Sequence, residues 1–123
     1  MGIENNECVI ATTWSKAAMQ KVKAWVDTLN NDERSLFAFL PGLVDSKETL
    51  FMAPDGSKKG WDIARQGESL RDQLIELLKT FDYEDGSNPF YWVEVGYGEF
   101  GQKVLRGNCK NVYGDEPYAA NIE

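Results

Sequence analysis

The sequence predicts an α+β fold: a two-layer sandwich in which a mainly antiparallel sheet of four to five strands carries two helices on one face. Two segments repeat apolar residues at helical spacing, and several short segments are rich in β-branched and aromatic residues. Turns that contain Gly, Pro or Asp separate these segments. The length of 123 residues fits a single α+β domain over residues 1–123.

The chain begins with a predicted strand and helix. Residues 7–13 are dominated by strand-forming side chains, and Ser15 is suited to cap a helix that begins at Lys16. In this helix the apolar residues recur at spacings of three and four, which predicts one buried face. They are Met19, Val22, Val26 and Leu29. The polar residues 30–32 predict the end of the helix.

Two short apolar runs follow, residues 36–40 and 49–53, and each ends at a proline. Their length and the polar turn at residues 45–47 predict a β-hairpin. Leu43 and Val44 either extend the first strand or form a bulge.

The clearest periodicity of the chain predicts a second helix, strongest from Ser69 to Phe81. Its apolar stripe contains Leu70, Leu74, Leu77 and Phe81. Because glycine weakens a helix, Gly67 leaves two starting points open: after Asp62 with an interruption, or at Ser69.

The remaining elements are a strand at residues 90–97, a glycine-bracketed turn at 98–101, a strand at 102–106 and an irregular tail at 108–123. In the first of these strands, one face carries two tyrosines and two valines, and the other carries Phe90, Trp92 and Glu94. The predicted order is β-α-β-β-α-β-β. Its first six elements permit a ferredoxin-like split βαβ arrangement.

Composition excludes several classes of function. The chain has no histidine, which removes Ser-His-Asp and Cys-His catalysis and every His-containing zinc site. No run approaches the ~18 apolar residues of a membrane helix. The net charge is −7: residues 1–61 contribute 7 basic and 8 acidic groups (−1), and residues 62–123 contribute 6 and 12 (−6). This charge repels phosphate backbones and anionic lipids, so nucleic-acid and membrane partners are disfavoured.

The two cysteines, Cys8 and Cys109, are too far apart in sequence for a CxxC redox or zinc motif. The N-terminus shows no charged segment followed by an apolar stretch, so we expect a cytoplasmic protein with reduced cysteines. Whether the two thiols pair stays open at this point.

Three motifs have both a functional and a structural interpretation. Residues 96–101 read GxGxxG, but a strand follows them and a nucleotide loop needs a helix, so a hairpin turn is favoured. The acids Asp82, Glu84 and Asp85 fail the spacing of a calcium loop and are interpreted as a solvated turn. Glu94 lacks an identifiable second carboxylate for acid–base catalysis. We therefore expect no metal ion, no cofactor and no catalytic residue.

The favoured function is a non-catalytic protein-binding module, such as an inhibitor, an immunity-type protein or a mimic of nucleic-acid charge, that docks on a basic partner. The surplus of carboxylates in residues 62–123 and the aromatic content of 12% motivate this hypothesis. The expected contact residues combine exposed acids with a large ring. They are Glu84, Asp85, Trp92, Glu94 and Glu99.

Two other functions remain open. The first is binding of a small ligand or nucleotide by a basic loop of hydroxyl, ammonium and indole groups, formed by Ser57, Lys58, Lys59 and Trp61. The second is a homo-oligomer assembled through an exposed sheet face or edge.

Overall fold

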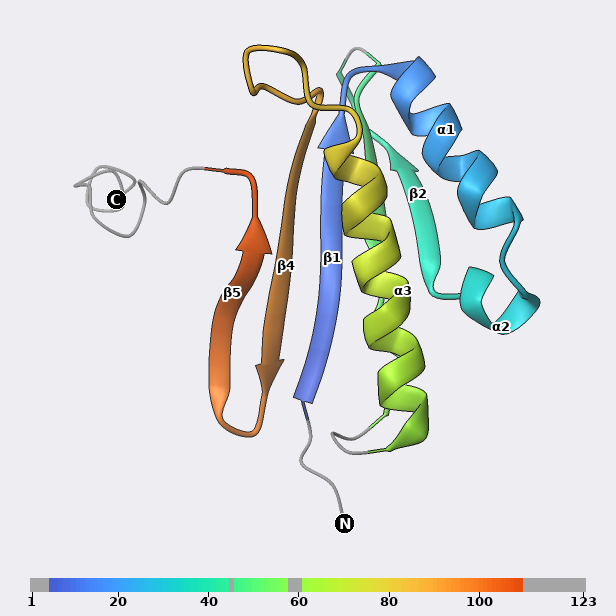
Figure 1. Ribbon diagram of the computed structural model, residues 1–123, viewed down its shortest axis with the longest axis vertical. Helices are drawn as coiled ribbons and strands as arrows, with labels where there is room; N and C mark the ends of the chain where they lie inside the picture. The colour runs from blue at the N-terminus through green and yellow to red at the C-terminus, as the bar shows by residue number, and fades with distance from the viewer. Residues whose placement is uncertain (1–4, 45, 58–60, 110–123) are drawn as a thin grey trace, which may run out of the picture.

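Five strands form one antiparallel sheet, and helices lie against it (Figure 1). The computed structural model describes residues 5–44, 46–57 and 61–109. The strands are β1 (Asn5–Thr13), β2 (Phe37–Pro41), β3 (Glu48–Met52), β4 (Phe90–Gly98) and β5 (Gly101–Gly107). The helices are α1 (Lys16–Asp27), α2 (Asn31–Arg34) and α3 (Asp62–Lys79). The predicted α+β class and order of the main elements are confirmed, and α2 is an addition.

The strand order across the sheet is β2-β3-β1-β4-β5, and every neighbouring pair is antiparallel. β1 and β2 therefore run in the same direction with β3 between them, and β3 and β4 do so with β1 between them. These are two interleaved split βαβ units, so the ferredoxin-like arrangement is present in the first four strands. β5 extends the sheet as the second arm of a hairpin with β4.

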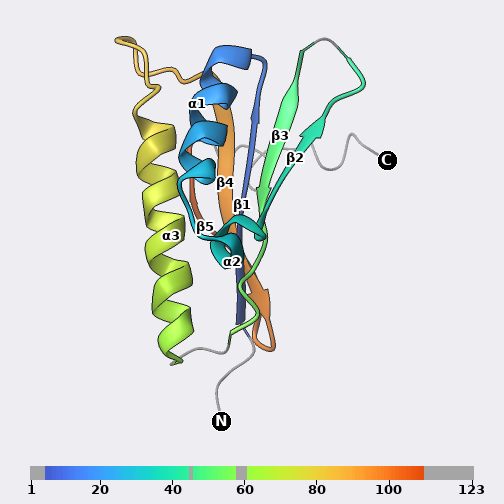
Figure 2. The same ribbon diagram turned by 90° about the vertical axis from the view of Figure 1, so that its right-hand side faces the viewer.

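Figure 2 shows α1 and α3 on the same side of the sheet, so the described chain forms two layers. The residues between the layers come from β1, α1, β3, α3 and β4, and they form one apolar cluster. The cluster comprises Val9, Ala11, Ala18, Met19, Val22, Leu50, Met52, Leu70, Leu74, Ile75, Leu78, Phe90 and Trp92. Burying a leucine side chain of this kind contributes about 1.5–3 kcal/mol. This packing fixes which face of each strand is covered.

The first helix begins where the sequence predicts. Ser15 caps α1 by accepting a hydrogen bond from the backbone N–H of Ala18 at 3.1 Å. The polar residues that follow α1 do more than end it. Asn30 accepts from the N–H of Glu33 at 2.8 Å and donates its own N–H to the Glu33 carboxylate at 3.3 Å. This capping box starts the short helix α2, which the prediction missed.

α3 starts at Asp62 and continues through Gly67 without interruption, which resolves its starting point. Gly67 is buried against the segment that follows β3: a Cβ there would stand 1.8 Å from Asp55 Oδ2. Glycine at this position therefore permits a close approach between the helix and Asp55, at a cost in helix propensity of about 1 kcal/mol relative to alanine.

Both predicted hairpins are present. β2 and β3 pair in register from Phe37 opposite Met52 to Pro41 opposite Glu48, and Leu43 and Val44 lie exposed outside the strands. The predicted turn residue 45 lies outside the described residues. Gly101 begins β5 with a φ of +111°, a conformation that glycine adopts without strain. The GxGxxG segment is thus part of a strand–turn–strand hairpin.

The start of the predicted irregular tail is attached to the sheet. Asn108 Oδ1 accepts from the Trp92 N–H at 2.9 Å, and Asn108 Nδ2 donates to the Phe90 carbonyl at 2.8 Å. Asn108 thereby continues the pairing of β4 beyond the end of β5. The other tail residues, 110–123, lie outside the described part of the chain.

Candidate functional site

A network of charged side chains crosses the interface between α3 and the sheet. Glu94 on β4 is only 3% exposed, and Arg71 on α3 is 5% exposed. Arg71 Nη2 donates to Glu7 Oε1 at 2.6 Å, and its Nε lies 3.2 Å from Glu94 Oε2. Arg106 on β5 donates to Glu94 from Nε at 2.6 Å and from Nη2 at 3.2 Å, and it also reaches Asp72 at 2.8 Å. The network joins three strands to one helix.

Opposite charges alternate through this network, and they affect the titration of Arg106. The hydrogen bond from Arg106 to Glu94, followed by the bond to Asp72, raises the pKa of Arg106, although burial acts in the opposite direction. Arg71 Nε approaches Glu94 as a charge contact and lacks the alignment of a hydrogen bond, so it has no hydrogen-bond partner among the described residues. Buried ion pairs are costly to break but do not by themselves add stability over an apolar core.

Two of the five expected contact residues are not on the surface. Trp92 is 4% exposed because it belongs to the apolar cluster between the sheet and the helices. Glu94 points to the same side, where Arg71 and Arg106 surround it. The alternation of β4 places both side chains under the helices. The structure therefore corrects their proposed role as contact residues: neither touches a partner while the two layers stay packed.

The other three expected contact residues are exposed but do not form one patch. Glu84 and Asp85 lie in the loop before β4, and Glu99 lies in the turn after it. Figure 1 shows this loop and this turn at opposite ends of the sheet. Nine residues of strand separate them by roughly 26 Å at the usual rise. The structure does not bring these acids together.

The acidic loop is organised by its own hydrogen bonds. Asp85 Oδ1 accepts from the Ser87 hydroxyl at 2.6 Å and from the Ser87 N–H at 2.9 Å, and these two bonds lower the pKa of Asp85. Asp82 accepts from Asn88 Nδ2 at 2.7 Å. These carboxylates shape the turn. Within residues 5–44, 46–57 and 61–109, no group of three or more Cys, Asp or Glu side chains is arranged to hold a metal ion.

The sheet face opposite α1 and α3, which we name the open face, has no helix over it in the part of the chain described (Figure 2). The strand registers define its residues: Ile10 pairs with Phe51 and Val93, and Val95 pairs with Val104. The full set is Asn6, Cys8, Ile10, Thr12, Ala38, Leu40, Thr49, Phe51, Tyr91, Val93, Val95, Tyr97, Gln102 and Val104.

None of these open-face residues is charged, although 27% of the chain is. Several are large, apolar and exposed: Tyr91 is 61% exposed, Val104 64% and Leu40 56%. At one end of the face Trp14 packs beside Tyr91, with ring centroids 6.4 Å apart. Contiguous exposed apolar surface of this kind commonly marks an interaction site. The alternation of β4 separated its two faces correctly but did not indicate which face is exposed, and the expected contact residues Trp92 and Glu94 belong to the other face.

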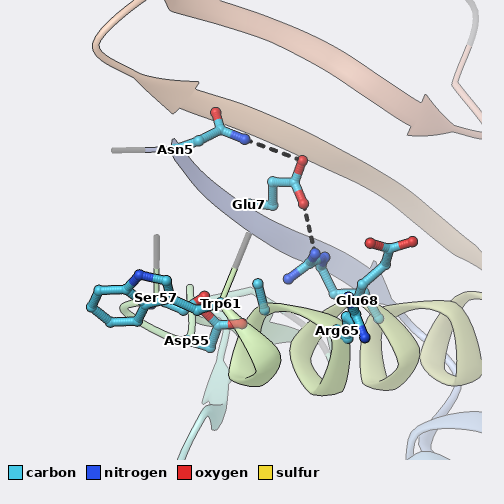
Figure 3. A pocket seen from close by; sticks show the side chains of 9 residues that line it. Asn5, Glu7, Asp55, Ser57, Trp61, Arg65 and Glu68 are labelled. Carbon is cyan, nitrogen blue, oxygen red and sulfur yellow. Dashed lines mark hydrogen bonds and ion pairs between the residues drawn. The ribbon is translucent and has the colours of Figure 1, made fainter. Parts of the chain in front are cut away.

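A polar pocket of about 260 Å³ lies between the N-terminal half of α3, the start of β1 and the segment after β3 (Figure 3). Asn5, Glu7, Asp55, Ser57, Trp61, Ala64, Arg65, Glu68 and Arg71 line it. We name it the Trp61 pocket. Glu7 accepts hydrogen bonds there from Asn5 and Arg71, and Figure 3 draws the contact between Asn5 and Glu7 as a dashed line. The pocket thus opens onto one end of the buried charge network.

The predicted ligand loop contributes two residues to this pocket. Ser57 donates its N–H and its hydroxyl to Asp55 Oδ1, at 2.8 and 2.5 Å. Trp61, which is 48% exposed, precedes the first turn of α3. Lys58 and Lys59 lie outside the described residues. The sequence did not indicate the other charged lining residues, because they come from β1 and the body of α3.

Arg71 is the clearest residue that the sequence analysis missed. It lies on the apolar stripe of α3, directly after Leu70 and three residues before Leu74, both of which are buried. A charged residue on a buried helix face needs a partner of opposite charge. The helical periodicity of the sequence therefore indicated that Arg71 needs an acidic partner. It could not identify Glu7 and Glu94 as those partners, because they are 64 and 23 positions away in the chain.

Both cysteines are free thiols. Cys8 is buried, and desolvation followed by the negative charge of Glu94 raises the pKa of its thiol, while Arg71 acts in the opposite direction. Cys109 is exposed. No disulfide joins the two thiols in the structure, so the pairing that the sequence left open is not formed. Among the described residues, no helix is long and apolar enough to span a membrane.

Comparisons by sequence and by structure found no protein family, no curated protein and no solved structure that this chain matches.

Proposed function

We propose that this protein is a non-catalytic binding module that docks on a basic protein partner through the open face of its sheet. The observation that carries the proposal is the absence of charge among the open-face residues, together with the exposure of Ile10, Tyr91, Tyr97 and Val104. An apolar centre bordered by polar surface is the usual anatomy of a protein interface.

The net negative charge of the chain favours a basic protein over a second copy of the chain as the partner. A second copy would bring another net charge of −7 to the face, whereas a basic protein is attracted toward it. Exposed acids lie beyond both ends of β4, in the loop with Glu84 and Asp85 and in the turn with Glu99. These positions suit lysine or arginine side chains at the rim of a partner. Because the open face itself is uncharged, docking by apolar contact is favoured over mimicry of nucleic-acid phosphates.

Affinity capture from lysate with matched variants tests the proposal. The double variant Tyr91→Ser/Val104→Ser removes apolar groups from the open face at exposed positions, so the fold should persist. The control is Ile63→Ser, which removes an exposed apolar group from α3. We expect the wild type and the control to capture the same basic protein, less of it at high salt, and the double variant to lose it. An acidic partner, or equal capture by the double variant, refutes the proposal.

A second candidate function is binding of a small ligand in the Trp61 pocket, which joins two residues of the predicted loop to a concave site. Tryptophan fluorescence with a panel of nucleotides and metabolites tests it, because Trp61 lines the pocket. A response that disappears in Trp61→Phe supports a ligand site there. A flat response across the panel removes this candidate.

A further inference from the structure

The Trp61 pocket contains charges of both signs that are not neutralised by one another. Arg65 and Glu68 line it from α3, and neither takes part in an ion pair between described residues. Asp55 uses Oδ1 to bind Ser57, and its Oδ2 has no hydrogen-bond partner among the described residues. The pocket therefore contains one cationic group, Arg65, and two anionic groups, Glu68 and Asp55, that form no ion pair between described residues.

A second observation points to a ligand. Arg71, 95% buried, lines the pocket: its Nε is turned toward Glu94 at 3.2 Å and its Nη2 donates to Glu7, whereas its Nη1 makes no hydrogen bond within the described part of the chain. Its Nη1 and Asp55 Oδ2 both lie beside Gly67, at 3.4 and 1.8 Å from the place where a Cβ would stand. No ion pair within 4 Å joins these two oppositely charged groups, although both are described. The two groups therefore lie more than 4 Å apart and do not neutralise each other.

From this arrangement we infer that the Trp61 pocket binds a small zwitterion, a free α-amino acid with an apolar side chain. Its carboxylate pairs with Arg71 and Arg65, and its ammonium group pairs with Asp55 and Glu68. A simple anion would meet the three carboxylates of Glu7, Asp55 and Glu68, and a simple cation would meet the two guanidinium groups; juxtaposed like charges disfavour both. A zwitterion satisfies both sets at once.

Size and apolar lining narrow the ligand class. The volume of about 260 Å³ lies below the ~300–1,000 Å³ of pockets that enclose drug-sized molecules, which fits a metabolite of amino-acid size. The indole of Trp61 and the methyl group of Ala64 provide the apolar part of the lining. The inference rests on the small-ligand candidate above and is independent of docking at the open face.

Calorimetric titration with L-leucine and two truncated analogues tests the inference. Isocaproate lacks the ammonium group of leucine, and isopentylamine lacks its carboxylate. We expect L-leucine to bind, and each analogue to bind about tenfold more weakly or worse, because each loses hydrogen bonds between charged groups. If isocaproate binds as tightly as L-leucine, the pocket is an anion site. If isopentylamine binds as tightly as L-leucine, it is a cation site. Either result overturns the inference.

Substitutions at exposed positions test whether L-leucine binds in this pocket, and they should leave the folded structure intact. Arg65→Gln and Glu68→Gln should each weaken L-leucine binding by about tenfold. The controls Lys79→Gln and Glu76→Gln make the same changes at the other end of α3 and should bind as the wild type does. Unchanged binding in both pocket variants overturns the inference.

Two further outcomes separate this inference from the candidate on which it rests. Binding of ATP or inorganic phosphate in the pocket, with no heat from L-leucine, overturns the amino-acid assignment and leaves a small-ligand site. No heat from any of these probes, together with a flat fluorescence response to the wider panel, overturns both.

Discussion

The substitution Glu94→Gln tests whether the buried charge network operates as described. Glu94 is almost fully buried, and its carboxylate faces two guanidinium groups. Glutamine has nearly the same shape but no charge, and its amide NH₂ places donors where the arginines need acceptors. The change therefore removes the counter-charge and leaves the volume of the side chain in place.

The structure allows the size of this effect to be worked out. Removing one partner of a buried ion pair costs about 3–5 kcal/mol. The Arg106 side chain is 40% exposed and keeps its bond to Asp72, so water and Asp72 compensate much of its loss. The Arg71 side chain is 6% exposed and retains only Glu7. We therefore expect Glu94→Gln to lower the free energy of unfolding by about 3 kcal/mol, the low end of that range.

Urea unfolding followed by tryptophan fluorescence measures this change, with Glu76→Gln as the control. Glu76 is 74% exposed in its side chain and pairs only with Lys79 at 3.4 Å, so its loss should cost no more than about 0.5 kcal/mol. The double variant Arg71→Met/Glu94→Leu removes both buried charges and should recover much of the stability lost in Glu94→Gln. A Glu94→Gln protein within about 0.5 kcal/mol of the wild type would refute the reasoning, because it would show that Glu94 is not needed as a counter-charge.

Two other expectations concern single sites. Gly67→Ala should not raise the free energy of unfolding by the ~1 kcal/mol that is usual for alanine in a helix, because the new Cβ meets Asp55. In a protein that already carries Asp55→Ala, the same substitution should give this gain, and equal effects in both backgrounds would contradict the contact. Because the pKa of the Cys8 thiol is raised in the folded protein, this thiol ionises at a lower pH in the unfolded chain than in the folded one. The stability that the neutral thiol contributes is therefore present below the ordinary thiol pKa and is lost as the pH rises through the folded pKa. Stability measured above about pH 9 should fall more steeply in the wild type than in Cys8→Ala, and iodoacetamide at neutral pH should label Cys109 well before Cys8.

Much of the fold follows from local patterns in the sequence. The Ser15 cap and the alternation of β4 each act within a few residues, and each has the predicted outcome. The apolar stripe of α3 is confirmed at Leu70 and Leu74, whereas the predicted Leu77 and Phe81 are only partly buried and Phe81 lies beyond the end of the helix. The missed helix α2 also had a local signal, the spacing of Asn30 and Glu33 that forms a capping box. The polar character of these residues was interpreted only as the end of α1.

The candidate surfaces were harder to predict because they depend on contacts between distant residues. Glu94 looks like an ordinary polar position of a half-exposed strand, and only the packing of α3 brings Arg71 to it. The Trp61 pocket likewise combines β1, the segment after β3 and α3, which the sequence does not place together. The open face was predictable from strand alternation, but its lack of charge becomes visible only when the register aligns all five strands.

Hydroxyl-radical footprinting of the protein alone and with its captured basic partner tests the docking surface most directly. In the isolated protein Tyr91 and Val104 should be modified readily, as their exposure requires. In the complex both should be protected, while Trp61 on α3's side of the molecule should react at an unchanged rate. Tyr91 and Val104 that are already protected in the isolated chain, or that stay fully reactive in the complex, would contradict the account.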